Sequence, residues 1–195
     1  MRVLVVYCHP VAESFNAAVR DAVLRGLARA GHEIDLIDLY AENFDPVMSR
    51  QERLDYHTPG LNVAPVADHL ARVKTAQGLV IVSPTWWYGP PAMLKGWLDR
   101  VFVPFETFGM PKPFRPLERR LTNIRTLAAV STLGSPWYWW LWVGRPGKRI
   151  IMEGLGGIIH PRARRIWLGL HSMDSASDRK RAAFLARVEA RFARL

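Results

Sequence analysis

The sequence predicts an α/β protein built on a doubly wound, five-stranded parallel sheet of order 2-1-3-4-5, with helices on both faces. The first observation is an apolar run at residues 3–6, typical of a strand buried on both faces of a parallel sheet. The second is that four similar runs follow, separated by helical stretches, as in right-handed βαβ units. The third is the length of 195 residues with 49% hydrophobic residues, which predicts one domain over residues 1–195.

The strands are placed by runs that are rich in apolar and β-branched residues. These runs predict strands at residues 1–7, 34–39, 78–82, 126–130 and 166–170. Apolar residues at helical spacing predict helices at residues 14–30, 65–76, 90–103, 147–159 and 178–194. Residues 40–60, which contain acidic residues, Pro and Gly, predict a long loop with one short helix.

Residues with special backbone preferences mark the helix ends. Gly31 stands where a glycine commonly ends a helix. Pro90 and Pro91 fall in the first turn of the third predicted helix, where a missing N–H costs little. Ser177 or Asp178 is a good cap for the last helix.

Charge and cysteine content restrict the classes of partner. The chain has 27 Lys and Arg against 17 Asp and Glu, and this net charge of +10 favours nucleic acid, a membrane surface or a phosphorylated cofactor, unless the basic residues simply form a solvated face. Because no nucleic-acid-binding motif accompanies the charge, we expect no nucleic-acid partner. With one cysteine, Cys8, neither an internal disulfide nor a cysteine zinc cluster can form, and we expect no metal.

The hydropathy pattern bears on localisation. No apolar run approaches the roughly 18 residues of a membrane-spanning helix. The start of the chain lacks the long apolar region of a secretory signal. We therefore expect a cytoplasmic protein.

Three loops should surround one ligand site. In a doubly wound sheet, ligands bind beyond the carboxyl ends of the strands, where the strand order reverses. The loops at residues 8–16, 83–91 and 131–142 follow the first, third and fourth strands and should meet there.

The first of these loops has the features of a phosphate site. Ser14 and Asn16 stand at the start of a helix, whose free N–H groups and dipole favour an anion, and His9 adds a donor. The plainer interpretation is that Ser14 only caps the helix and His9 only satisfies a turn. Neither a GxGxxG nor a GxxxxGK[ST] motif is present, so the Rossmann dinucleotide fingerprint and the P-loop are both absent.

The second loop places three aromatic residues directly after a buried strand. Trp86, Trp87 and Tyr88 are held between Pro84 and the Gly-Pro-Pro of residues 89–91. They would form a rigid, flat platform that suits a planar ring system such as a flavin. Ordinary packing at a helix start is the alternative.

The third loop joins small residues to a very apolar segment. Backbone N–H groups of residues 131–136 could hold the polar edge of a bound ring and stabilise negative charge on it. The next six residues, Trp137–Trp142, are too apolar for a solvated loop. They would line a site for an apolar substrate, pack in a dimer interface, or rest on a membrane surface.

Three spaced stretches, covering roughly residues 1–105, together resemble the flavin-dependent NAD(P)H:quinone oxidoreductases of flavodoxin-like fold. The first is His9 with the Ser-Phe-Asn of residues 14–16, and the second is DLYAENFDPVMSR at residues 38–50. The third runs from PTWWYGPPAMLKGW at residue 84 to the Arg-Val-Phe of residues 100–102.

The resemblance implies three groups of cofactor-binding residues. It places His9, Phe15, Asn16 and Ala17 near the cofactor phosphates, together with Ser14 at the start of the helix. It places Thr85, Trp86, Trp87 and Tyr88 at the flavin edge around N5 and O4, and Pro84 stands beside them. As backbone donors near N1 and O2 it places Ser131, Thr132, Leu133 and Gly134.

The resemblance also implies an activity, that of an NAD(P)H dehydrogenase (quinone). NAD(P)H would pass a hydride to flavin N5 and leave, and a quinone or similar acceptor would then take the hydride in a ping-pong reaction. Members are homodimers with the active site at the subunit interface. Residues 38–50 resemble those of FAD-binding members, so we expect FAD; FMN is the alternative, because some short members bind FMN.

The sequence departs from the family pattern after the third loop. Tyr138 lies close to the position of a tyrosine that assists quinone reduction in some members, and we take it as the candidate catalytic residue. An alignment shifted by one residue would put Trp139 there, and no histidine follows until His160. An alternative function is a regulatory, flavin-binding cytoplasmic subunit of a membrane potassium-efflux system. The basic surface and Trp137–Trp142 would suit such docking or another peripheral membrane contact.

Overall fold

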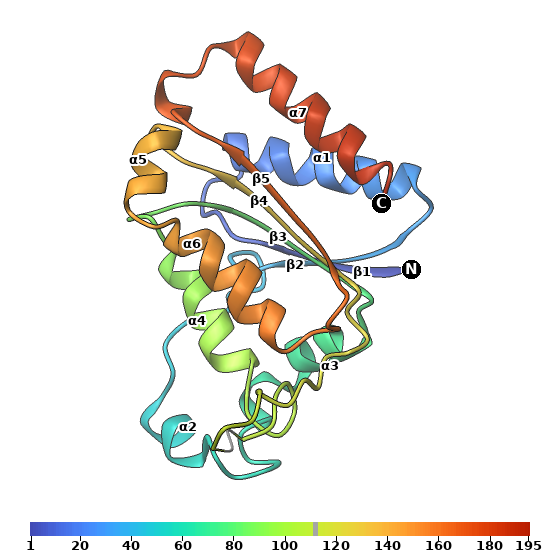
Figure 1. The fold of residues 1–195 in the computed structure, drawn as a ribbon, viewed down its shortest axis with the longest axis vertical. Coiled ribbons are helices and arrows are strands. Elements are labelled where there is room, and N and C mark those ends of the chain that lie inside the picture. The colour runs from blue at the N-terminus through green and yellow to red at the C-terminus, as the bar shows by residue number, and fades with distance from the viewer. Residues whose placement is uncertain (111–112) are drawn as a thin grey trace.

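The computed structural model describes residues 1–110 and 113–195 and contains one five-stranded sheet (Figure 1). All neighbouring strands are parallel, and their order is β2-β1-β3-β4-β5. The strands are β1 (Arg2–Tyr7), β2 (Glu33–Asp38), β3 (Gly78–Pro84), β4 (Thr126–Thr132) and β5 (Arg164–Leu170). The predicted fold class and strand order are therefore confirmed.

Helices cover both faces of the sheet (Figure 1). The α-helices are α1 (Phe15–Arg29), α2 (Arg50–Asp55), α3 (Ala67–Thr75), α4 (Ala92–Val101), α5 (Trp137–Trp142), α6 (Pro146–Arg149) and α7 (Asp178–Phe192). Shorter helical turns are η1 (Ala64–Val66), the π-helical η2 (Ile150–Gly154), η3 (Leu155–Gly157) and η4 (Met173–Ser175). Helices α1 and α7 pack on one face, and α3, α4 and the segment from α6 to η3 pack on the other.

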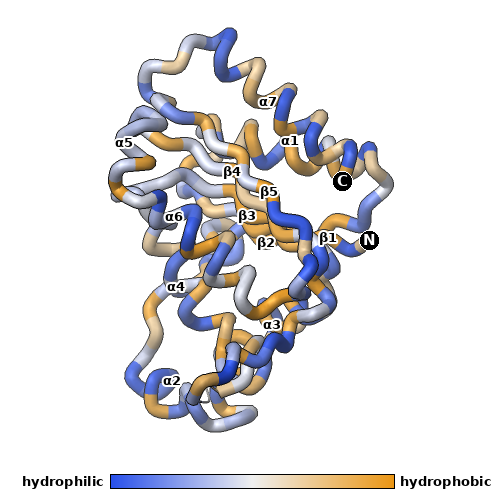
Figure 2. Tube along the Cα trace, in the orientation of Figure 1, coloured by the Kyte–Doolittle hydropathy of each residue, from blue (hydrophilic) through white to orange (hydrophobic). Residues whose placement is uncertain are grey.

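The core follows from the alternation of side chains along the central strands. Val3 and Val5 of β1 point toward α1 and α7, whereas Leu4 and Val6 point toward α3 and α4. Every residue of β3 and β4 is buried, and Figure 2 shows the hydrophobic colour concentrated along the middle of the sheet. Burial on both faces explains why the strands read as continuous apolar runs.

The predicted helix-end signals fall at helix ends. Ser177 caps α7 by accepting a hydrogen bond from the Lys180 N–H (3.3 Å), and Gly31 has a φ of +70° just after α1. The predicted helix over residues 147–159 is broken into α6, η2 and η3, in keeping with its glycines.

Two local predictions are wrong. Residues 137–142 form the helix α5 and not a loop. Six consecutive apolar residues have no helical periodicity, so only their packing distinguishes a helix from a loop. Pro90 and Pro91 precede α4, which begins at Ala92, because a proline disfavours helical backbone in the residue before it.

Within the two described stretches, no helix is both long and apolar enough to cross a bilayer.

The closest approach between α1 and α7 gives a test of this packing. A Cβ atom on Gly26 would lie 2.6 Å from the Glu189 carbonyl oxygen and 2.7 Å from Phe192 Cβ. We expect Gly26→Ala to lower the free energy of unfolding by about 1–3 kcal/mol, because the helices must separate. Gly154→Ala is the control, since nothing lies within 4 Å of its added Cβ. Urea unfolding measures both, and equal effects would contradict the close contact.

Candidate active site

A cleft of about 440 Å³ lies at the carboxyl ends of β1, β3 and β4. A smaller hollow of about 220 Å³ adjoins it and shares Thr85, Trp87 and Gly134 with it. The parallel register pairs Pro84 with Thr132 at the ends of β3 and β4, so their loops leave the sheet at one edge. The cleft is thus at the place where doubly wound sheets bind ligands.

The first turn of α1 forms one end of the cleft. The Ser14 side chain caps the helix by accepting a hydrogen bond from the Ala17 N–H (3.2 Å). The N–H groups of Phe15 and Asn16 precede the first intrahelical bonds, and both residues line the cleft. Together with the helix dipole, they give this end of the cleft the features of an anion site.

Asn16 has an unpartnered polar atom inside this end of the cleft. Its side chain is buried, and Nδ2 donates a hydrogen bond to Thr132 Oγ1 (2.9 Å). Its Oδ1 is also buried and has no hydrogen-bond partner among the described residues. A buried acceptor without a partner costs free energy, so a ligand group that donates a hydrogen bond would be stabilised here.

His9 lies over the second loop. Its ring contacts Trp86 edge-on, with the centroids 6.1 Å apart. Its Nδ1 is engaged by the Val11 backbone, 3.1 Å from the nitrogen and 3.2 Å from the carbonyl oxygen, which leaves Nε2 as the ring nitrogen that can contact a ligand. His9 lines the cleft, so this nitrogen is available to an anion at the α1 end.

The second loop is a strained two-residue turn. Trp86 and Gly89 exchange backbone hydrogen bonds, both 3.0 Å long, and the two central residues have positive φ: +48° for Trp87 and +63° for Tyr88. Such turns favour Asn-Gly, and each bulky residue in this conformation costs about 1–2 kcal/mol. Trp87 is 95% exposed, so packing within the chain does not offset its strain. Strain of this kind concentrates at functional sites.

Two helices hold the turn in place from the other side. The Gly147 N–H of α6 donates to the Tyr88 carbonyl oxygen (2.9 Å), and Trp139 Nε1 of α5 donates to Tyr88 Oη (2.7 Å). A Cβ atom on Gly147 would lie 3.1 Å from the Tyr88 oxygen, so only glycine allows this approach without adjustment. Tyr88 is thereby fixed relative to the cleft.

The third loop completes the wall opposite the turn. The Leu133 N–H donates to the Leu170 carbonyl oxygen (2.9 Å), which fixes the start of the loop on β5. Gly134 and Ser135 follow and line the smaller hollow. Thr85 Oγ1 and Ser131 Oγ lie 2.8 Å apart, and this hydrogen bond joins the second and third loops below the cleft.

Most of the predicted cofactor-binding residues come together here. Those that line the cleft or the hollow are His9, Ser14, Phe15, Asn16, Pro84, Thr85, Trp86, Trp87, Tyr88, Thr132, Leu133 and Gly134. Ala17 and Ser131 line neither, because Ala17 is buried in α1 and Ser131 supports Thr85 from beneath. Ser135 of the third loop, whose backbone was predicted as a donor, lines the hollow, whereas Met173 and Asp174 were not predicted, although the loop after the fifth strand reaches the same edge.

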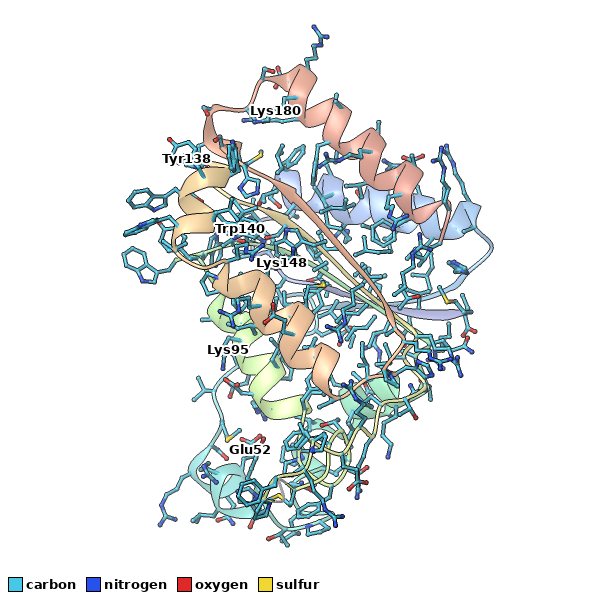
Figure 3. All side chains as sticks on the ribbon, in the orientation of Figure 1. Glu52, Lys95, Tyr138, Trp140, Lys148 and Lys180 are labelled. Atoms are coloured by element: carbon cyan, nitrogen blue, oxygen red, sulfur yellow. The ribbon has the colours of Figure 1, made fainter. Side chains whose placement is uncertain are left out.

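An exposed aromatic surface borders the hollow. Its members are Trp87, Trp137, Tyr138, Trp139, Leu141 and Trp142, with exposed fractions from 43% to 95%. Figure 3 shows Tyr138 on α5 at the end of the molecule where the aromatic side chains project outward. Trp140 points inward instead and stacks on Trp167, with centroids 5.9 Å apart. Tyr138 itself lines neither the cleft nor the hollow.

The single cysteine, Cys8, is buried, and its thiol is unreactive at neutral pH. Cys8 is fully buried at the end of β1, and this burial raises the pKa of its thiol to about 12. The thiolate, which is the nucleophile, is therefore suppressed at neutral pH.

We therefore predict that a thiol reagent leaves Cys8 unmodified at pH 8 in the native protein and labels it after unfolding in urea. Because the thiol ionises at lower pH in the unfolded chain, its contribution to stability falls as the pH rises from about 9 to 12. Rapid labelling of the native protein would contradict this burial.

Comparison with known proteins identifies relatives. A family described as "Flavodoxin-like fold" matches residues 1–150. An uncharacterised NAD(P)H oxidoreductase of Escherichia coli K12, YcaK, is 34% identical over 102 residues, or 52% of each chain. The NAD(P)H dehydrogenase (quinone) 1 of Cavia porcellus is 34% identical over 119 residues, covering 52% of this chain and 43% of that protein. The chain spans about half the length of these curated relatives.

Solved structures agree over the whole chain. Smu.1420 from Streptococcus mutans UA159 is 31% identical, covers 100% of both chains and has a TM-score of 0.84. The NAD(P)H:quinone oxidoreductase from Methanothermobacter marburgensis is 26% identical, with a TM-score of 0.81 over 99% of this chain and 94% of that one. This chain therefore belongs to the flavodoxin-like fold family that includes the NAD(P)H:quinone oxidoreductases.

Proposed function

We propose that the protein is a flavin-dependent NAD(P)H:quinone oxidoreductase. The observation that carries this proposal is the continuous space between an anion site at the start of α1 and the exposed, strained aromatic turn. A flavin nucleotide has these two ends, a phosphate and a planar ring. The names of the relatives, an NAD(P)H dehydrogenase (quinone) and an NAD(P)H:quinone oxidoreductase, support the same activity.

The residues of the cleft fit such a cofactor from end to end. The phosphates would accept hydrogen bonds from the N–H groups of Phe15 and Asn16 and from His9 Nε2. A ribityl hydroxyl would donate to the unpartnered Oδ1 of Asn16. The ring would lie against Trp87 and Tyr88.

The third loop would face the opposite, polar edge of the ring. Backbone N–H groups of Gly134 and Ser135 would donate hydrogen bonds there and stabilise negative charge. The redox chemistry, a ping-pong transfer of a hydride from NAD(P)H to the acceptor by way of N5, would be supplied by a flavin held by these residues. The chain's own role is to hold the ring and leave one face open to both substrates.

We propose FAD as the cofactor, with FMN as the alternative. Support for FAD is the resemblance of residues 38–50 to FAD-binding members. Mass spectrometry of the cofactor released by denaturation distinguishes the two directly.

The exposed aromatic surface supports a homodimer with the active site at its interface. Contiguous exposed apolar residues of this size mark interaction sites. A second copy covering Trp139 and Trp142 would close the open side of the hollow against water. Tyr138, on the same surface, would then reach the acceptor and donate a proton to it.

The role of Tyr138 has a direct test. We expect Tyr138→Phe to leave reduction of the flavin by NAD(P)H unchanged and to lower the rate of the quinone half-reaction about tenfold or more, because a proton donor is lost. Stopped-flow absorbance measures the two half-reactions separately. Equal slowing of both would contradict a role in proton donation.

The activity is tested by the visible spectrum of the purified protein. We expect a flavin band near 450 nm that bleaches when NADPH is added without oxygen and returns when a benzoquinone follows. A band that does not bleach would contradict the reductase and favour a regulatory flavin protein. Failure to bind FAD or FMN would overturn the assignment of the cleft as a flavin site.

The strained turn gives a sharper test with a matched control. Trp87→Asn puts a residue that tolerates positive φ at the turn, so the flavin-free protein should become more stable by about 1 kcal/mol while flavin affinity falls at least tenfold. Phe114→Asn is the control, because Phe114 is also an exposed aromatic with a positive φ, +56°, and does not line the cleft. It should gain stability and keep its flavin affinity. Unchanged flavin affinity in Trp87→Asn would contradict the role of Trp87 as a platform for the flavin ring.

A further inference from the structure

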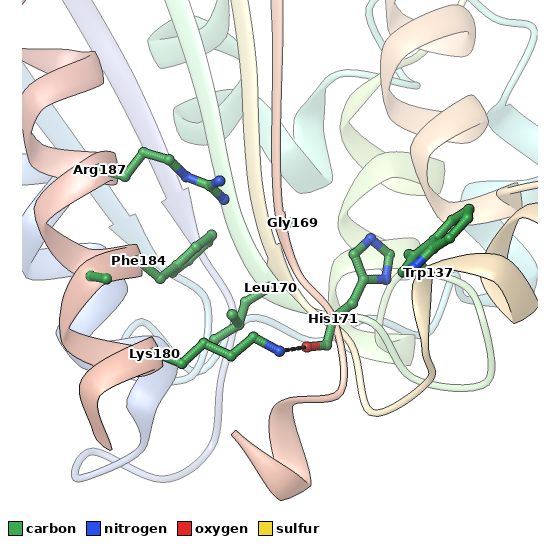
Figure 4. Close-up of a pocket in the computed structure, with 8 residues that line it drawn as sticks. Trp137, Gly169, Leu170, His171, Lys180, Phe184 and Arg187 are labelled. Carbon is green, nitrogen blue, oxygen red and sulfur yellow. Dashed lines mark hydrogen bonds between the residues drawn. The ribbon is translucent and has the colours of Figure 1, made fainter. Parts of the chain in front are cut away.

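A separate pocket of about 380 Å³ lies between β5 and α7 (Figure 4). Strand β5 is at the edge of the sheet, so its outer side has no neighbouring strand within the described residues. The pocket shares no lining residue with the cleft or with the smaller hollow. It is therefore a separate pocket from the proposed cofactor cleft.

The walls of this edge pocket are largely apolar. Leu170 of β5 and Phe184 of α7 form its floor and are almost fully buried, and Ala183 and the Trp137 ring add further apolar surface. Apolar and aromatic walls with a few polar groups are typical of small-molecule sites, and a volume of several hundred Å³ accommodates one. The ligand should therefore have an apolar, planar body.

The charged residues that line the pocket are both cations on one face of α7. Lys180 and Arg187 are seven residues apart, which places them two helical turns or about 10 Å from each other. Figure 4 shows them on either side of Phe184, which lies between them on the helix. The Arg187 guanidinium lies 5.1 Å from the centre of the Phe184 ring, which holds the cation against the apolar wall.

Neither cation is neutralised by a carboxylate in the described part of the chain. Lys180 Nζ donates one hydrogen bond to the His171 carbonyl oxygen (3.0 Å), which leaves two of its three donors. The two acidic residues of α7 pair with other cations, Asp178 with Arg181 and Glu189 with Arg25 and Arg29 of α1. The pocket thus presents two cations with unused donors at opposite ends of an apolar wall.

We propose that the edge pocket binds a small organic dianion with a planar apolar body, of the aromatic dicarboxylate class. One carboxylate pairs with the Arg187 guanidinium, whose planar fork matches carboxylate geometry. The other pairs with the Lys180 ammonium, and the ring between them lies over Phe184.

The test is a calorimetric titration of 2,6-naphthalenedicarboxylate into the purified protein, before and after saturation with FAD. We expect binding in both cases with the same affinity, because the edge pocket is separate from the cleft. The uncharged 2,6-naphthalenedimethanol should bind at least tenfold more weakly, since it makes no charge-assisted hydrogen bond.

Three single variants assign the site. Arg187→Gln and Lys180→Gln should each weaken the dianion about tenfold or more. Arg179→Gln removes the same charge from α7 outside the pocket and should leave the affinity unchanged. Circular dichroism of each variant verifies folding. No binding by the wild-type protein, or equal weakening by Arg179→Gln, would overturn the edge pocket as a dianion site. Competition with FAD would overturn its independence from the cleft.

Discussion

The parallel pairing of β1, β3 and β4 is the constraint on which the rest of the structure depends. These strands are apolar on both faces, so they are stable only when helices cover both sides. The pairing also makes the strands end at one edge, where Pro84 and Thr132 lie side by side. Loops distant in sequence then meet, and the start of α1 faces the turn after β3 across one cleft.

Rigidity of the core permits strain at this edge. Two aromatic residues with positive φ in a two-residue turn are unfavourable by themselves, and Trp87 gains little from packing within the chain. Hydrogen bonds from Gly147 and Trp139 hold Tyr88 and fix the turn. The unpartnered Oδ1 of Asn16 is a second unfavourable feature in the same cleft. Both are understandable if a ligand contacts them, since function concentrates where local stability is sacrificed.

Helices α5 and α7 each have one side that packs against the rest of the chain and another side that is exposed or lines a pocket. Trp140 anchors α5 through Trp167, while the other aromatic residues of α5 face outward beside the cleft. On α7, one side packs against α1 around Gly26, and another side presents Lys180 and Arg187 to the edge pocket.

The sequence by itself determined the strands, their order, and most residues of the cleft, because burial on both faces leaves continuous apolar runs and because the family motifs lie within residues 1–105. Tertiary structure alone decided the rest. The state of Trp137–Trp142 depended on the anchoring of Trp140, which no local pattern encodes. Asp174 lines the cleft because the loop after β5 leaves the same edge of the sheet, and Lys180 and Arg187 line a pocket because α7 packs beside β5.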